Sequence, residues 1–207
     1  MKRIAVIYAE TDMSVGHATW TKRILEDWRI GEIVFYGSYP TTATDVSGLL
    51  LKVKESRPDI MVAHTYAGDT LLVFSQMKEL NISAKVLIIG GVGATTSAFY
   101  TRFDNKTKEG VITWSNWYPD MHPTIKEFFN RYYSKYGYTH MNVQQGLVMI
   151  SCFIFKEAIE RAGTLNYDKI REVLGSSEFD TPFGRIGFSN QIINRPWILF
   201  IQYQEEL

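Results

Sequence analysis

Cysteine is almost absent from this chain of 207 residues, since Cys152 is the only one. A single thiol cannot form a disulfide within the chain, and it cannot build a zinc site alone. Cys152 lies within the apolar run 146–155, so we expect it to be a small buried apolar residue. The cysteine content therefore leaves the redox compartment open, and the sequence suggests no metal and no cofactor.

Long apolar runs and an excess of one charge are also missing. No segment reaches the roughly 18 to 20 apolar residues that a membrane span requires. Residues 1–8 look superficially like a signal peptide, but the apolar stretch is too short, and Glu10 and Asp12 interrupt it. Either the protein is cytoplasmic or the sequence begins after the natural start. Lysine plus arginine balances aspartate plus glutamate at 22 each, which argues against nucleic acid as a partner.

The motifs of common enzyme classes are missing as well. There is no P-loop, no GxSxG elbow, no HExxH and no paired-carboxylate motif. The loop 90–96 is rich in glycine, but Thr96 stands where a dinucleotide-binding loop requires its third glycine, so we interpret it as a tight turn with close backbone approach. His64 and Asp69 could form an acid–base pair, since both would face one crevice. A hydrogen-bonded pocket wall is the commoner role of a histidine at a strand end, so we do not expect an enzyme.

What the first half does contain is an alternation of two kinds of segment. Short apolar β-rich runs are typical of parallel strands covered on both faces. Helical patterns separate them; one of these spans 46–53, with Thr44 or Asp45 placed to cap it, and another has Asp69 near its start. The sequence therefore predicts an α/β fold with a doubly wound parallel sheet. The predicted strands are 4–8, 33–36, 60–64 and 86–89.

After about residue 114 the alternating pattern gives way to helical patterns, which are followed by short strand-like segments. Pro123 opens the first helix, a longer one covers 142–161, and Asn166 caps a third. The stretch 146–155 is apolar all round, so we expect burial on most of its sides. The predicted organisation is an α/β domain over 1–113, a helical segment over 114–180 and a β return over 181–207.

Ligands of open parallel sheets bind beyond the carboxyl ends of the strands, where the strand order reverses. Each loop there opens or points at a helix, whose free N–H groups suit an anion such as a carboxylate. Four loops meet this condition: 9–16, 37–45, 65–69 and 90–95.

Several short segments, each weak alone, together follow the order and spacing of one known family across nearly the whole chain. They are Tyr39-Pro40 with Thr44-Asp45-Val46-Ser47, Lys52 with Arg57-Pro58-Asp59, Gly91-Val92-Gly93, Glu109-Gly110-Val111, Phe128 with Tyr132 and Tyr136-Gly137, 158–163, and 181–186 with Phe188.

In these segments the chain resembles the type I periplasmic binding proteins of the branched-chain amino acid class, which serve ABC transporters. The family has two α/β lobes joined by three crossovers, with the solute between them. The resemblance implies that 1–113 is the second lobe, that 114–180 is a crossover followed by helices of the first lobe, and that 181–207 returns toward the hinge. It also implies a periplasmic or extracytoplasmic protein whose partners are a small solute, an amino acid or other small carboxylate, and a transporter permease.

The resemblance places ligand contacts residue by residue. The aromatic that the family often has before the first helix glycine falls at Val15, ahead of Gly16, and the family's tyrosine after the third strand matches Tyr66. The acid that pairs with an amino acid's ammonium group would fall at Gly90, so Asp69 is the candidate substitute, and neutral or aromatic acids are alternative solutes. The expected ligand-binding residues are Val15, Gly16, His64, Thr65, Tyr66, Asp69, Gly91, Val92 and Gly93, in a turn that extends to Thr95.

The family's first-lobe sheet has no counterpart in this sequence, and the helix 142–161 would pack against it. Bare apolar surface costs about 25 cal/mol per Å², so we expect this helix to fold back onto its own lobe, swap with a second copy or meet a partner chain, which predicts a homo-oligomer. Three alternative functions stay open: a cytoplasmic ligand-sensing domain of the same fold, a self-associating half-domain, and an enzyme of flavodoxin-like architecture.

Overall fold

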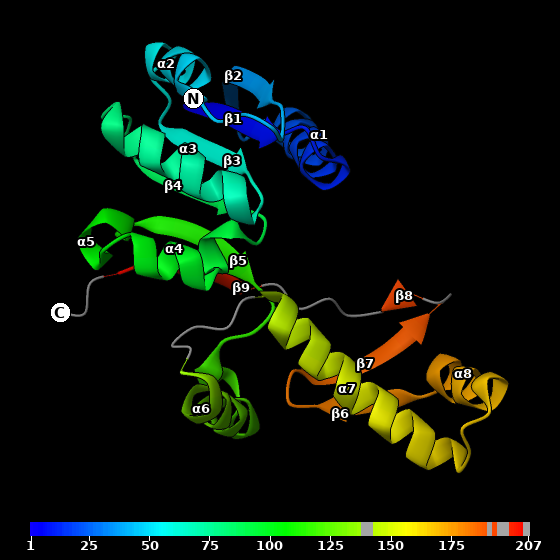
Figure 1. Cartoon of the computed structure of the whole chain (residues 1–207). Coiled ribbons are helices and arrows are strands. Elements are labelled where there is room, and N and C mark those ends of the chain that lie inside the picture. Colours follow the sequence, from blue (N-terminus) through cyan, green and yellow to red (C-terminus); the bar gives the residue numbers. More distant parts are fainter. Residues whose placement is uncertain (138–142, 190–191, 194–198, 205–207) are drawn as a thin grey trace. The chain divides into compact units, whose positions relative to one another are not determined.

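The structure is a computed structural model that describes residues 1–137, 143–189, 192–193 and 199–204. The chain forms two compact units (Figure 1). The first unit contains Met1–Trp114 and the residues from Phe200 onward, and the second contains Ser115–Leu199. The return to the first unit therefore begins at Phe200, and the strand at 184–189 belongs to the second unit. No helix among the described residues is long and apolar enough to cross a membrane.

The first unit is built on a six-stranded sheet in the order β2-β1-β3-β4-β5-β9. The pairs β1/β2, β1/β3, β3/β4 and β4/β5 are parallel, which confirms the predicted doubly wound sheet. Each predicted strand of the first half is present: β3 has the predicted bounds, and the other three are one to five residues longer. The strands are β1 (Lys2–Ala9), β2 (Gly31–Tyr39), β3 (Ile60–His64), β4 (Val86–Gly90), β5 (Val111–Ser115) and β9 (Leu199–Gln202).

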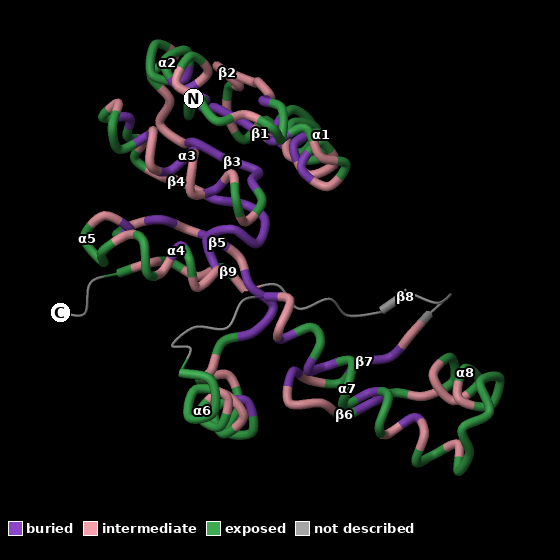
Figure 2. The backbone as a smooth tube through the Cα atoms, viewed as in Figure 1, coloured by how far each residue is buried: buried purple, intermediate pink, exposed green. Residues whose placement is uncertain are grey.

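Helices cover this sheet because the side chains of a strand alternate between its two faces. Ile4 and Val6 of β1 pack with Ala18 of α1 on one face, whereas Ala5 and Ile7 pack with α2 and α3 on the other. Figure 2 shows β1 and β3 buried over much of their length. The helices of this unit are α1 (Asp12–Asp27), α2 (Ser47–Glu55), α3 (Ala67–Glu79), the 3-10 turn η1 (Gly93–Thr95), α4 (Ser97–Arg102) and α5 (Asn105–Lys108).

The start of α2 differs in detail from the prediction. Its N-cap residue is Val46, which makes no side-chain cap, and not Thr44 or Asp45. Asp45 still satisfies a free backbone donor, since its carboxylate accepts from the Ser47 N–H at 2.8 Å. The predicted position of Asp69 is confirmed, because it lies in the first turn of α3.

The second unit combines three longer helices with a small antiparallel sheet in the order β6-β7-β8. Its core gathers Trp117, Ile154 and Phe179 from elements far apart in the sequence. Helix α7 approaches Trp117 closely at Gly146, where a Cβ would lie 2.2 Å from the indole Cδ1. The elements are η2 (Pro119–Met121), α6 (Pro123–Tyr136), α7 (Val143–Ala162), α8 (Tyr167–Ser176), β6 (Glu178–Thr181), β7 (Gly184–Ser189) and β8 (Ile192–Ile193). The cap predicted for α8 is confirmed, since Asn166 accepts from the Lys169 N–H.

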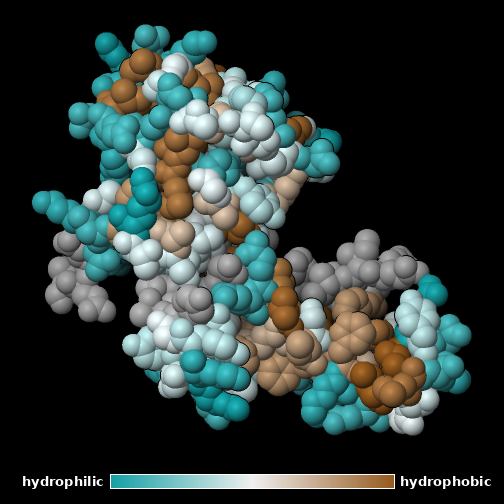
Figure 3. All heavy atoms as spheres, in the orientation of Figure 1, coloured by the Kyte–Doolittle hydropathy of each residue, from teal (hydrophilic) through white to brown (hydrophobic). Residues whose placement is uncertain are grey.

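Two predictions about α7 are wrong within this chain. We expected burial on most sides, but only one side packs into the core, and Val148 and Phe155 are 63% and 54% exposed. Cys152, expected to be buried, is an exposed free thiol on the same side as these two residues. Figure 3 shows hydrophobic side chains at the surface in the region of α7. One side of this apolar stretch is therefore exposed to solvent. The hydrophobicity of the sequence alone does not show which sides of the helix are buried.

Candidate functional site

The strand order of the first unit defines where a ligand site should lie. The chain runs from β1 outward to β2 and then crosses back to β3, so the order reverses between β1 and β3. In doubly wound sheets the crevice at this switch point, beyond the carboxyl ends of the strands, is the usual place for a ligand. Here that edge is formed by the loops after β1, β3 and β4, each of which leads into a helix or a helical turn.

The loop after β1 ends in a well-capped helix start. Thr11 is the N-cap of α1, and its hydroxyl accepts from the Ser14 N–H at 3.1 Å. The next turn presents Val15, which is 41% exposed, and Gly16, where an added Cβ would meet no atom within 4 Å. These two predicted ligand residues lie at the surface beside the positive end of a 16-residue helix.

The loop after β3 exposes the aromatic residue Tyr66 and is held by the polar side chain of Asp69. Tyr66 is 43% exposed. Asp69 holds this loop, because its carboxylate accepts from the Tyr66 N–H at 2.8 Å and from the Tyr39 hydroxyl at 2.6 Å. Burial and this carboxylate raise the pKa of Tyr39 well above its ordinary value, so the phenol remains a donor. Asp69 therefore positions Tyr66 from within the unit.

The loop after β4 packs beneath the loop after β3. Gly91 has a φ of +94°, and a Cβ there would lie 2.1 Å from the Thr65 carbonyl oxygen. A Cβ at Gly93 would lie 1.7 Å from the Thr70 Oγ1. The predicted tight turn with close backbone approach is confirmed, since neither position has room for a side chain. Thr65, Gly91, Val92 and Gly93, all predicted as ligand residues, are buried in this junction, as is Thr95.

His64 ends β3 and is 9% exposed. Its Nε2 shares a hydrogen bond with the Thr21 hydroxyl at 2.9 Å, and its ring centroid lies 5.7 Å from that of His17. Burial, with a smaller contribution from His17, lowers the pKa of His64 to about 4, so the imidazole is neutral near pH 7. Among the described residues, no hydrogen bond joins His64 to Asp69, so the acid–base pair considered from the sequence is not assembled.

Sequence reasoning missed the residues that hold the predicted ones in place. Tyr39, Thr70 and Thr21 anchor Asp69, Thr65 and His64 respectively. Their pairings join positions up to 43 residues apart, which a local pattern does not reveal. The one available signal was the place of Tyr39 within the predicted ligand loop 37–45, three residues after the predicted strand 33–36.

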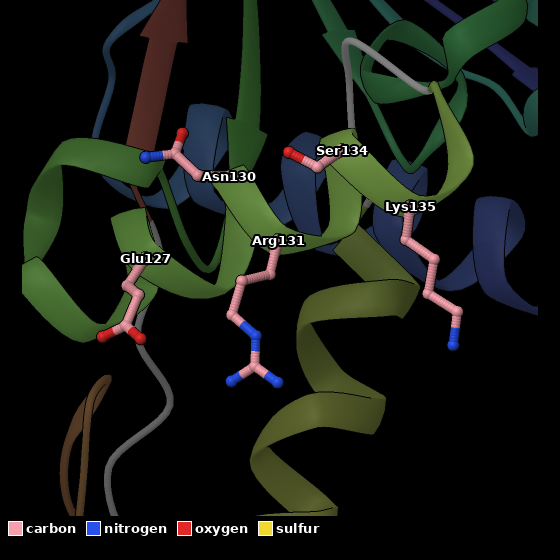
Figure 4. A pocket seen from close by; sticks show the side chains of 5 residues that line it. All are labelled: Glu127, Asn130, Arg131, Ser134 and Lys135. Atoms are coloured by element: carbon pink, nitrogen blue, oxygen red, sulfur yellow. The ribbon is translucent and has the colours of Figure 1, made fainter.

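A separate hollow of about 430 Å³ lies on the second unit, along α6. Figure 4 shows that one helix supplies every labelled residue and that Arg131 and Lys135 extend in the same direction from successive turns. A hollow lined by one helix is open to solvent and cannot enclose a ligand, so it is a weaker candidate than the sheet edge. In the described part of the chain there is no cluster of three or more side chains suited to a metal ion.

Comparison with known proteins shows the family and the fold of the chain. The family model of periplasmic binding proteins matches residues 1–200. The leucine-, isoleucine-, valine-, threonine- and alanine-binding protein of Pseudomonas aeruginosa is 24% identical over 194 residues, which cover 92% of this chain and 50% of that protein. The chain thus spans about half the length of the relatives it matches.

Solved structures show the same fold. A leucine binding protein from Thermotoga maritima has a TM-score of 0.80 at 21% identity, covering 99% of this chain and 58% of its own. A solute binding protein of an ABC transporter from Rhodopseudomonas palustris, solved with 3,4-dihydroxybenzoic acid, has a TM-score of 0.81 at 18% identity, covering 97% and 56%. The resemblance to type I binding proteins of the branched-chain amino acid class is confirmed. With a matched region that extends from residue 1 to residue 200, the chain belongs to the periplasmic binding protein family.

Proposed function

We propose that the chain is part of the substrate-binding component of an ABC transporter and binds a small carboxylate, an amino acid or a related acid. The observation that carries this proposal is the edge of the first unit at its switch point. There the start of α1, with exposed Val15 and half-buried Gly16, and the start of α3, with exposed Tyr66, follow the two strands at which the order reverses.

The chemistry of this edge suits a carboxylate with an apolar body. The positive ends of two helix dipoles attract an anion. The Tyr66 ring offers a flat apolar surface and a hydroxyl. Relatives are named as binding proteins for amino acids, and one similar structure holds an aromatic acid, which supports binding without catalysis. We infer a periplasmic or extracytoplasmic location and a transporter permease as partner from the family.

A thermal-shift screen followed by calorimetry tests this function. The panel contains leucine, isoleucine, valine, 4-methylpentanoate, benzoate and 3,4-dihydroxybenzoate. A ligand at 100 times its dissociation constant adds about 2.7 kcal/mol to the free energy of unfolding, which raises the melting temperature measurably. No stabilisation by any member of the panel at millimolar concentration would contradict the proposal.

A charge variant locates the site. Gly16→Asp puts a carboxylate into open space beside the start of α1, where it should repel an anionic solute and lower affinity by about tenfold or more. Gly175→Asp adds the same charge in α8, also where a side chain meets nothing within 4 Å, and should leave affinity unchanged. Equal affinities of the two variants would place the solute elsewhere.

Self-association is the second candidate function, and the open face of α7 favours it. Val148, Cys152 and Phe155 follow one another on that side at helical spacing, and all three are exposed. A second copy of the chain could cover this face. Light scattering at several concentrations tests the idea: a concentration-dependent dimer that Val148→Lys abolishes would support it, and a strict monomer would contradict it.

A further inference from the structure

Helix α1 carries an aromatic stripe, formed by Trp20, Ile24 and Trp28, that its own unit leaves open to solvent. The three side chains are 60%, 42% and 75% exposed. They follow one another at intervals of four residues, and Trp28 continues the helical spacing because its N–H donates to the Ile24 carbonyl at 3.0 Å. The side of α1 that packs on the sheet uses Ala18 and Leu25 instead. Figure 2 shows α1 exposed along much of its length.

The charges beside this stripe are of both signs. Arg23 and Asp27 lie one turn apart along the same edge of it and form an exposed ion pair at 3.5 Å. The Arg23 guanidinium also lies over the Trp20 ring, 5.2 Å from the ring centroid. Farther round the helix, Lys22 is balanced by Glu26. Membrane surfaces and nucleic acids attract faces that are mainly basic, so this face suits a protein surface that carries both charges as well.

A second copy of α1 is such a surface. If two copies pack antiparallel about a two-fold axis centred near Ile24, Trp20 of one copy lies beside Trp28 of the other. The charges then match too. Because Arg23 and Asp27 share one edge of the stripe, the same rotation puts each Arg23 opposite the Asp27 of the other copy. The net charge of zero also removes long-range repulsion between copies.

The exposed area indicates how strong such a pairing should be. A tryptophan has up to about 250 Å² of surface, so the exposed fractions of Trp20 and Trp28 leave roughly 300 Å² of indole surface per copy. A dimer would bury about twice this area, and Ile24 with the flanking side chains would bring the total to about 1,000 Å², which is the lower limit of a specific interface. Tryptophans supply much of the binding energy in small interfaces. The stripe therefore fits a weak, reversible dimer.

We propose that the aromatic stripe of α1 is the interface of an antiparallel two-fold dimer of this chain. The dimer does not depend on the proposed function, because the stripe occupies the later turns of α1, whereas Val15 and Gly16 lie near its start. It is also distinct from self-association through α7, which belongs to the second unit.

Sedimentation equilibrium of the wild-type chain, from micromolar to near-millimolar concentration, tests the proposal. The chain should show a reversible equilibrium between monomer and dimer, which Trp28→Lys should weaken by about tenfold or more. Val148→Lys places the same charge on the exposed side of α7 and is the matched control, so it should keep the wild-type dissociation constant. A circular dichroism melt checks that both variants fold. A wild type that stays monomeric, or a dimer that Trp28→Lys does not weaken, would overturn the proposal.

Exchanging the flanking charges tests the antiparallel arrangement without touching the tryptophans. Arg23→Glu and Asp27→Arg each put like charges opposite one another in the dimer, so each variant alone should dimerise about fivefold more weakly than the wild type. In an equimolar mixture the two variants complement each other at both ion pairs, and the dimer fraction should return toward the wild-type value at the same total concentration. A mixture that dimerises no better than either variant alone would overturn the antiparallel pairing.

Discussion

Acid should destabilise this protein through His64. The pKa of His64 is lowered to about 4 in the folded chain, against about 6.5 in an unfolded one. Protonation therefore favours the unfolded state, and the stability that His64 contributes is complete above about pH 6.5 and is lost as the pH falls toward 4. Between about pH 7.5 and 4.5 this linkage lowers the free energy of unfolding by roughly 2 to 3 kcal/mol. Urea denaturation of the wild type at the two pH values measures it.

His64→Gln is the comparison that isolates this group, because glutamine does not titrate and its amide can still pair with Thr21. Every other side chain is the same in both proteins, so the difference between the two proteins isolates position 64. The variant should lose about 2 to 3 kcal/mol less than the wild type on acidification. An equal loss in both proteins would show that His64 is protonated without cost in the folded state and would refute the argument for a neutral strand end.

The remaining predictions concern glycines. Gly93→Ala should destabilise the first unit by about 2 kcal/mol or more and weaken solute binding, because its Cβ would overlap Thr70 beneath the loop of Tyr66. Gly146→Ala should destabilise the second unit by about 1 to 3 kcal/mol through overlap with Trp117. Gly175→Ala, a helical position with open space, should be neutral or stabilising by up to about 1 kcal/mol. Urea denaturation measures all three, and a neutral Gly93→Ala or Gly146→Ala would contradict the close approaches.

The strands and helices of the first unit could be predicted because they depend on local sequence patterns. Runs such as 60–64 are apolar on successive residues, which is typical of a strand covered on both faces, and β3 coincides with this run. The cap at Asn166 and the acidic residue at the start of α3 are equally local. The family resemblance then added the candidate site, whose ligand contacts stay a prediction.

The parts that could not be predicted depend on which surfaces meet. The stretch 146–155 is apolar on every side, so periodicity cannot tell that Gly146 and Ile154 pack into the core while Cys152 faces outward. The same holds at the strand ends. The sequence shows a glycine at position 90 and a histidine at 64, but only register brings their positions together and shows why the first must lack a side chain.

The turn beneath the candidate site is also bonded to Tyr203, the residue that follows the returning strand β9. Tyr203 donates its N–H to the Val111 carbonyl at 3.0 Å and its hydroxyl to the Ala94 carbonyl, 109 positions away in sequence. Ala94 belongs to the same turn as Gly93, which supports the loop that presents Tyr66. These hydrogen bonds therefore join the return segment to the turn that lies beneath the proposed solute-binding edge.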